Sequence, residues 1–305
     1  MGSKGSNGIL VYIAAIVSIT LWGFSYIWNN ELISLGVPIF YFVFIRVLIA
    51  GVILLLFNLL TGKFKPIRKE HLLLFLLLSV CEPFVYFIAE TYGIKETGSP
   101  TISSMIIASV PVFSMVAGAV VFNEKVTFLN ILGLVVTLGG LAMVLFSKVD
   151  EGVGQHFALG IVLLVVAVLI EVVYASLTKR LASDYPPQVI VMYQFLIGAV
   201  YFLPVFLTEG LENYEPLFLS WQVQKPILCL AILCSSLAFS LWAFSIKNLG
   251  VARSSVFLAM ISVVTAFGSV TLGQEQLCTM QWVGIAVSVV GITVSQHVGR
   301  DVRIS

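Results

Sequence analysis

The sequence predicts an all-α membrane protein in which ten transmembrane helices form two inverted five-helix repeats, with both termini in the cytoplasm. Three observations lead there: the composition, ten long apolar runs, and a similarity between the two halves of the chain. Of 305 residues, 59% are apolar and 10% are charged, and the mean hydropathy is +1.07. Soluble domains carry about a quarter charged residues and could not cover so much apolar surface. The composition therefore argues against soluble enzymes, nucleic-acid binders and disordered chains.

The apolar residues are gathered in runs long enough to cross a bilayer as helices. A helix needs about 20 apolar residues to span about 30 Å of hydrocarbon, and continuous runs disfavour membrane β-strands, which alternate. Charged residues and glycines collect between the runs, and Pro100 stands where the start of a helix tolerates its missing N–H. The predicted spans are Ile9–Trp28, Ile39–Leu60, Leu72–Tyr92, Thr101–Phe122, Phe128–Phe146, Ala158–Thr178, Val189–Leu207, Ile227–Ile246, Ser254–Leu272 and Trp282–Gln296.

The distribution of Lys and Arg predicts the orientation. Ten spans place both termini on one side of the membrane, and twelve of the sixteen Lys and Arg residues fall on that side. Three fall on the opposite side, and Arg46 lies inside a span. Because cytoplasmic loops are enriched in Lys and Arg, the split predicts cytoplasmic termini.

The two halves, residues 1–152 and 153–305, resemble each other. The segment from Val121 aligns with the segment from Leu272, which pairs Glu124 with Glu275. The same alignment pairs Gly133 with Gly284 and Gly140 with Gly291. Each half has an odd number of predicted spans, so the second copy must be upside down in the bilayer. Inverted repeats are typical of secondary transporters, which bind substrate near the midplane between the halves.

Several motifs resemble the drug/metabolite transporter superfamily, in its EamA-type branch. They are LWGFSYIWNNELI in the first span, FVFIRVLIAGVILLL in the second, and the Pro111–Glu124 tail of the fourth with the Gly-rich fifth span. The second half has Ser262 in place of Pro111 and Gln194 near the position of Arg46. The resemblance implies a carrier whose central cavity is lined by the first four helices of each half, with the fifth and tenth at the periphery. Members export amino acids and metabolites, extrude cationic compounds, or move sugars and nucleotide sugars.

Four ionisable residues lie inside the predicted spans and are candidates for function, because charges in a bilayer are costly. Glu82 and Glu90 lie in the third span, Glu171 in the sixth and Arg46 in the second. One reading is a buried ion pair between Arg46 and one carboxylate. At least one carboxylate is then left over, and in a low-dielectric site it is a candidate proton carrier. Glu82 and Glu171 are the main candidates, since Pro83 also frees a backbone carbonyl beside Glu82.

Polar and aromatic residues that share helix faces are the candidate substrate contacts. Tyr86 shares a face with Glu82 and Glu90, and Tyr174 shares one with Glu171. Aromatic faces beside carboxylates suit an amine or a quaternary ammonium. The glycines of the fifth and tenth spans instead allow close helix packing, within one protomer or across a dimer. The full set of candidates for the central cavity is Trp22, Ser25, Glu82, Tyr86, Glu90, Glu171, Tyr174, Gln194, Tyr201 and Trp242, with Asn29, Ser235 and Phe239 on the same stripes.

These observations favour a secondary transporter over the other membrane classes. No spacing for zinc, intramembrane catalysis, a P-loop or a selectivity filter is present, and the four cysteines are scattered. We therefore expect no enzymatic activity, no cofactor and no metal. The expected partners are a small-molecule substrate and the lipid bilayer, without nucleic acid, for a monomer or homodimer in the cell inner (plasma) membrane. The expected activity is export of an amino acid or other amine-bearing or cationic compound, with proton coupling as a hypothesis; the alternative is a gradient-independent facilitator of sugar-like or nucleotide-like metabolites.

Overall fold

The computed structural model describes residues 4–114, 127–149, 156–210, 216–251, 254 and 256–295, and within these ranges every regular element is a helix. The first half holds α1 (Lys4–Ser34), α2 (Ile39–Leu60), η1 (Lys69–His71), α3 (Leu72–Ser79), η2 (Val80–Val85), α4 (Tyr86–Thr97), α5 (Pro100–Ile107) and α7 (Phe128–Val149). The second holds α8 (Phe157–Leu181), α9 (Pro187–Val205), η3 (Phe206–Gly210), η4 (Pro216–Leu219), α10 (Trp221–Leu228), η5 (Cys229–Ala238), α11 (Phe239–Leu249), η6 (Val256–Leu258), α13 (Ala259–Thr271) and α14 (Thr279–Ser295).

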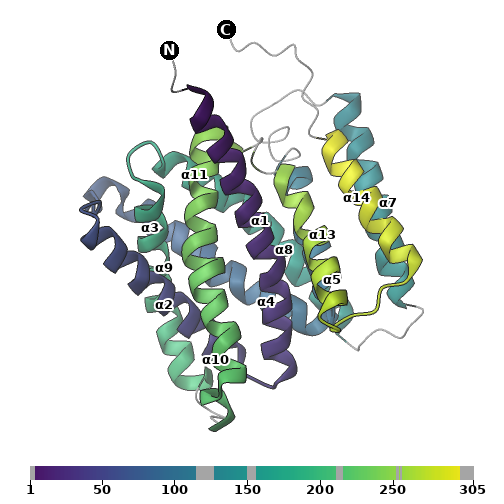
Figure 1. Cartoon of the computed structure of the whole chain (residues 1–305), viewed down its shortest axis with the longest axis horizontal. Helices are drawn as coiled ribbons and strands as arrows, with labels where there is room; N and C mark the ends of the chain where they lie inside the picture. The colour runs from purple at the N-terminus through teal and green to yellow at the C-terminus, as the bar shows by residue number, and fades with distance from the viewer. Residues whose placement is uncertain are drawn as a thin grey trace.

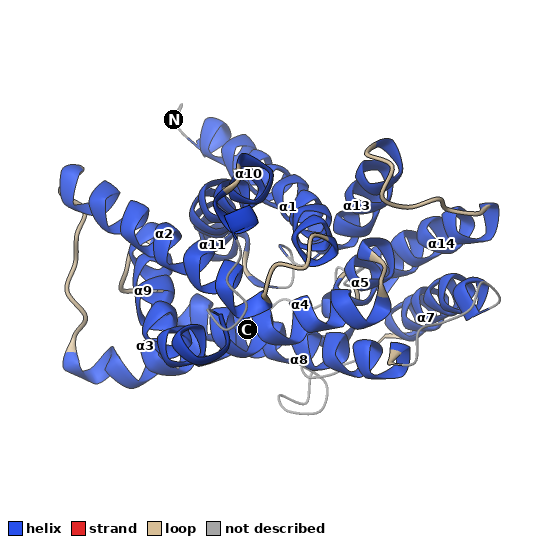
Figure 2. Ribbon diagram, turned by 90° about the horizontal axis from the view of Figure 1, so that it is seen from below, coloured by secondary structure: helices blue, strands red, loops and turns tan. Residues whose placement is uncertain are grey.

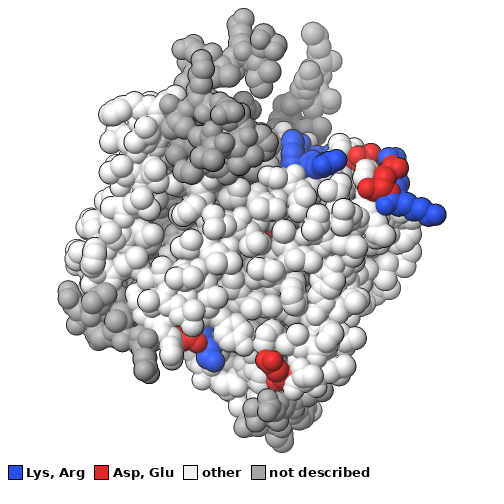
Figure 3. All heavy atoms as spheres, turned by 180° about the vertical axis from the view of Figure 1, so that it is seen from behind, with Lys and Arg blue, Asp and Glu red and all other residues white. Residues whose placement is uncertain are grey.

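Among the described residues, seven helices are long and apolar enough to cross a membrane. Three shorter apolar helices, Pro100–Ser114, Ala259–Thr271 and Thr279–Ser295, fall in the fourth, ninth and tenth predicted spans. Charged side chains gather at the two ends of the face in Figure 3, and the broad band between them is largely uncharged. This division between polar ends and an apolar girdle is what a bilayer requires.

The helices pack in a regular scheme that brings the two halves of the chain together. The first helix, α1, packs against α11 and α13, while α8 packs against α4 and α5 (Figure 1). A further pair, α2 and α9, also joins the two halves, and the start of α1 and the end of α14 lie at the same end of the bundle. These contacts place α1, α4, α8 and α11 around the centre.

Helices α7 and α14 lie side by side at one edge of the bundle (Figure 2). Glycines explain their close approach: a Cβ added to Gly140 would stand 2.5 Å from the carbonyl oxygen of Gly284. A Cβ on Gly291 would stand 2.4 Å from the backbone nitrogen of Thr137. The glycine contacts therefore lie within one protomer, and they put the two helices at the periphery, as the resemblance implied. Glu124, which the repeat pairs with Glu275, lies outside the described residues.

The third predicted span, Leu72–Tyr92, is interrupted rather than continuous. Its middle is the π-helical segment η2, where Glu82 has the non-helical dihedrals φ −145° and ψ 122°. Pro83 follows, and a proline has no backbone N–H to give to a helix. Gly198 of α9 lies against this break, since a Cβ there would stand 2.4 Å from Pro83 Cγ. The interruption therefore gives Glu82 a backbone conformation that differs from the helical turns on either side.

Candidate functional site

An internal cavity in the centre of the bundle brings together residues from both halves of the chain. About 400 Å³ of space in and around it is free of protein atoms, a figure that includes open solvent. Three carboxylates, one guanidinium and several aromatic rings line it. The lining residues are Trp22, Ser25, Tyr26, Arg46, Glu82, Tyr86, Phe87, Glu90, Ile107, Glu171, Phe239, Leu258 and Ile261.

The three carboxylates come from different parts of the fold and are all deeply buried. Glu82 extends from η2, Glu90 from α4 and Glu171 from α8, and their exposed fractions are 2%, 4% and 6%. Glu82 and Glu171 lie near each other on the lining of the cavity. The second oxygen of Glu82, Oε2, has no protein partner. The cavity therefore offers a carboxyl pair together with a free acceptor.

Glu90 accepts a hydrogen bond from a phenol group. The hydroxyl of Tyr86, one turn earlier on α4, donates to Glu90 Oε1 at 3.1 Å. Tyr26 of α1 also lines the cavity with Glu90. Tyr26 lies four residues after Trp22, so the spacing that indicated Trp22 and Ser25 also placed Tyr26 on that face.

Arg46 makes no ion pair with a carboxylate among the described residues. Its Nε donates to the hydroxyl of Ser235 at 2.7 Å, and its guanidinium lies 4.0 Å from the centre of the Phe87 ring. Its side chain is 2% exposed, and Nη1 has no hydrogen-bond partner in the protein. A guanidinium over an aromatic face is favourably placed, so Arg46 is held in position while Nη1 stays free.

Aromatic rings form one wall of the cavity. The indole N–H of Trp22 donates to the carbonyl oxygen of Cys234 at 3.2 Å. The ring centre of Trp22 lies 4.9 Å from that of Phe239 and 5.3 Å from that of Trp242, in edge-on arrangements. These contacts hold the Trp22 ring rigidly on the lining of the cavity. Ser25, one turn further along α1, donates to the carbonyl oxygen of Trp22 at 2.7 Å.

Four of the predicted cavity residues do not line it. Tyr174 donates to Gln194 Oε1 at 3.2 Å, and its ring contacts Phe239 from behind the lining. Trp242 likewise lies behind Trp22. Tyr201 lies away from the cavity and donates to the carbonyl oxygen of Leu76 at 3.4 Å. Sequence reasoning had no signal for the apolar lining residues, Ile107, Leu258 and Ile261, which come from the helix pair α5 and α13 and the short η6 beside it.

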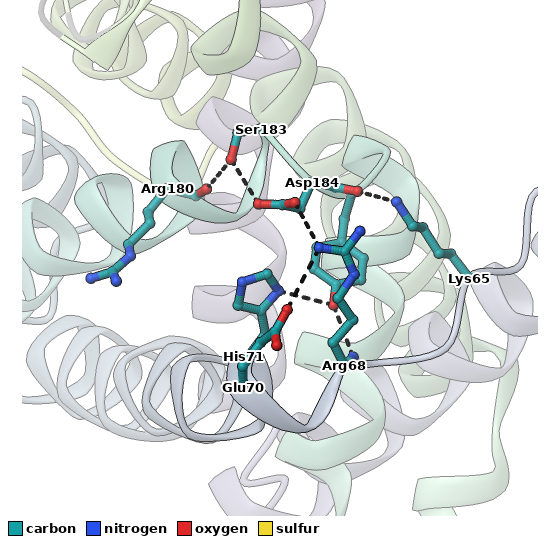
Figure 4. Close-up of polar contacts among 8 residues, drawn as sticks. Lys65, Arg68, Glu70, His71, Arg180, Ser183 and Asp184 are labelled. Atoms are coloured by element: carbon teal, nitrogen blue, oxygen red, sulfur yellow. Dashed lines mark hydrogen bonds and ion pairs between the residues drawn. The ribbon is translucent and has the colours of Figure 1, made fainter.

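A polar cluster outside the cavity fastens the α2–α3 connection to the α8–α9 connection (Figure 4). Arg68 Nη1 lies 3.2 Å from Asp184 Oδ1, and Lys65 donates to the Asp184 carbonyl oxygen. The hydroxyl of Tyr185 accepts from the Arg68 backbone and hydrogen-bonds His71 Nδ1 at 3.1 Å. Partly exposed ion pairs of this kind contribute about 0–1 kcal/mol each to stability. The cluster therefore connects the two loops but adds little to the stability of the fold.

A second group of polar contacts joins the two halves of the chain at the opposite end of the bundle. The carboxylate of Glu275 accepts hydrogen bonds from the hydroxyls of Ser99 and Thr101 and from the Thr101 backbone N–H, at the start of α5. The neighbouring Gln274 accepts from Asn30 at 3.1 Å and donates to the Ile27 carbonyl oxygen at 3.1 Å. Within the described part of the chain, no cluster of His, Cys, Asp or Glu has the arrangement of a metal site.

The sequence also matches known proteins along nearly its whole length. A model of the EamA-like transporter family matches residues 9–146 and again residues 158–295. The chain belongs to the EamA-like transporter family. The resemblance stated from the motifs is thereby confirmed, and this member of the EamA-like family is a membrane protein that transports a small molecule.

The chain is similar in sequence to other transporters and in structure to a solved protein. The uncharacterized transporter YetK of Bacillus subtilis is 24% identical over 302 residues, covering 96% of this chain and 90% of that protein. A probable terminal-alkyne amino-acid exporter of Streptantibioticus cattleyicolor is 29% identical over 195 residues, 62% of each chain. One crystal structure of a protein with 16% sequence identity superposes with a TM-score of 0.70, covering 93% of this chain and 96% of that one. That likeness concerns the fold alone.

Proposed function

We propose that this EamA-family transporter exports a small amine-bearing metabolite, an amino acid or another cationic compound, through the central cavity. The observation that carries the proposal is the set of three buried carboxylates, Glu82, Glu90 and Glu171, beside aromatic rings in one cavity. A protonated amine is attracted both to carboxylates and to the faces of aromatic rings. The probable terminal-alkyne amino-acid exporter among the relatives supports the same substrate class.

The transport step would be alternating access of two inverted five-helix repeats, residues 1–152 and 153–305, making ten spans with cytoplasmic termini in the plasma membrane. Two matches to the family model, one in each half, support the repeat. The packing also supports it, because α1 contacts α11 and α13 just as α8 contacts α4 and α5. Two halves that surround one cavity can expose it to either side in turn.

Proton coupling would pass through Glu82 and Glu171. Two buried carboxyl groups that lie near each other repel when both are ionised, which favours a proton on one of them. An amine that binds the free Oε2 of Glu82 favours the ionised form, as a positive charge beside a carboxylate does. Substrate and proton would therefore compete for the same carboxyl pair, and inward movement of a proton could drive outward movement of the amine.

The test is transport by purified protein in liposomes with an imposed pH gradient. The probes are amino acids, polyamines, quaternary amines and sugars, with flux and internal pH recorded together. We expect an amine to move with a proton signal, and Glu82→Gln and Glu171→Gln to lose gradient-driven flux. Glu96→Gln, on α4 but outside the cavity, is the matched control and should behave as the native protein does.

Three outcomes separate the alternatives. If both Glu→Gln variants keep pH-driven transport, the coupling is wrong. Flux of an amine without any pH response would indicate a facilitator that uses no gradient. Flux of sugars or nucleotides alone would overturn the amine assignment; anionic nucleotides are disfavoured because the described lining has three carboxylates against one guanidinium.

A further inference from the structure

The central cavity contains both a free donor and a free acceptor, each deeply buried. Nη1 of Arg46 has no hydrogen-bond partner, and neither does Oε2 of Glu82. Both side chains are 2% exposed and both line the cavity. Burying an unsatisfied polar atom is costly, and more so when the group carries charge. Two such atoms of opposite character in one cavity indicate a ligand that satisfies both.

Arg46 is already positioned to receive such a ligand. The hydroxyl of Ser235 holds its Nε, and the Phe87 ring lies beneath the guanidinium plane. Glu90, the carboxylate that shares its helix with Phe87, accepts from Tyr86 at 3.1 Å rather than from Arg46. The guanidinium is therefore fixed by contacts that leave its outer nitrogen available, and a guanidinium binds carboxylates with directional hydrogen bonds.

We propose that Arg46 Nη1 is the ligand for an anionic group of the substrate, so that the cavity takes a dipolar molecule such as an α-amino acid. The substrate carboxylate binds Arg46, and the substrate ammonium binds the carboxylates, with Glu82 Oε2 as the free acceptor. This inference rests on the proposed function and narrows it, because it disfavours amines that have no carboxylate. A simple cation would leave Arg46 unsatisfied and would face a like charge.

The experiment is equilibrium binding to the full-length protein in lipid nanodiscs, which avoids passive leakage of amines across a vesicle. The probes are the twenty common L-amino acids, followed by two analogues of the tightest binder. One analogue is its amide, which keeps the amine and loses the carboxylate charge. The other is its deaminated acid, which keeps the carboxylate alone. We expect each analogue to bind about 10- to 150-fold more weakly than the amino acid, the value of one hydrogen bond to a charged group.

Variants of Arg46 assign the effect to this residue. In Arg46→Gln the affinity for the amino acid should fall to the affinity for its amide, so that the ratio of the two affinities approaches one. Arg46→Lys keeps a point charge without the planar fork, and its ratio should lie between those of the native protein and Arg46→Gln. The control is Asn58→Leu, because Asn58 is buried on the same helix but does not line the cavity. This variant should keep the native ratio of the affinities for the amino acid and its amide.

The outcomes distinguish the inference from the function on which it rests. If the native protein binds the amide as tightly as the amino acid, Arg46 is not an anion ligand, while amine transport stands. If the amino acid is preferred but Arg46→Gln keeps the preference, another group recognises the carboxylate and the inference is overturned. If no amino acid and no amine binds, the inference and the proposed function both fail.

Discussion

Glu82 reaches the cavity because the backbone around it leaves the helical path. Its non-helical dihedrals precede Pro83, and the helix resumes at Tyr86. The break is held from outside by Gly198, the position on α9 where only a hydrogen atom fits against the proline ring. The position of Glu82, a candidate substrate contact, thus depends on the size of a residue on another helix.

We therefore predict that Gly198→Ala displaces Pro83 and the neighbouring Glu82, although residue 198 does not itself line the cavity. The new methyl group would stand 2.4 Å from Pro83 Cγ and 2.7 Å from Cδ, and a rigid ring cannot rotate away. We expect a loss of about 1–3 kcal/mol of stability, typical of overpacking, together with weaker substrate binding. Thermal unfolding in detergent and equilibrium binding measure the two effects.

The control for Gly198→Ala is Gly139→Ala. A Cβ at Gly139 meets nothing within 4 Å, and alanine is the better helix former by about 1 kcal/mol. Equal unfolding temperatures for Gly198→Ala and the native protein would show that Pro83 can shift freely.

The sequence singled out the charged residues that line the central cavity and missed their partners. Glu82, Glu90 and Glu171 could be found because an ionisable residue in an apolar run stands out. The ion pair considered for Arg46 does not form in the structure, where Ser235 and Phe87 contact its guanidinium. Those partners lie on other helices, and contacts between helices far apart in the chain leave no mark in the spacing of one sequence.

The peripheral helices α7 and α14 show how helices associate in a bilayer, where the hydrophobic effect does not drive one helix against another. Small residues let the two backbones come within van der Waals contact, and packing then supplies the stabilisation. Gly140 faces α14, whereas the adjacent Gly139 is exposed on the outer face. The two neighbouring glycines therefore provide a matched comparison.

We predict that Gly140→Leu separates α7 from α14 and lowers stability by at least about 1–3 kcal/mol, whereas Gly139→Leu does not. A Cβ at position 140 would meet the backbone of Gly284 at 2.5 Å and of Ser288 at 2.6 Å, and a backbone cannot move aside as a side chain can. The midpoint of thermal unfolding should drop for the first variant only. Similar midpoints for both variants would contradict the packing.

Sequence reasoning located the helices better than their interruptions. Apolar length predicted the runs at α1, α2, α8 and α9 directly, because each run is uniform. The π-helical segments η2 and η5 went undetected, since hydropathy carries no information about which carbonyl a backbone N–H selects. Pro83 offered a local signal for η2; within η5, Cys229–Ala238, no proline or glycine marks the change.

Polar contacts join the two halves of the chain at both ends of the helix bundle. One end has the cluster of Arg68, Asp184 and Tyr185, and the other has the contacts of Glu275 with Ser99 and Thr101. The predicted topology assigns the first end to the cytoplasm and the second to the outside. The assignment depends on the count of ten spans, because one span fewer would reverse every later loop.

A native cysteine makes that topology measurable. Cys278, an exposed free thiol, lies between α13 and α14 in the loop that carries Glu275. We predict that a membrane-impermeant maleimide labels Cys278 in intact cells when the other three cysteines are replaced by alanine. The positive-inside distribution is the physical reason, since it places this Lys-free loop outside.

The control is a single cysteine at the opposite end, Lys69→Cys in the exposed η1, with Cys278→Ser. This thiol should react only after the cells are made permeable. Labelling of Lys69→Cys but not Cys278 in intact cells would mean that the whole protein is inverted, and that the proposed export would run as uptake for the same gradient. Labelling of both from outside would mean that an even number of spans, rather than the predicted odd number, separates η1 from the loop of Cys278, and it would remove the inverted repeat on which alternating access depends.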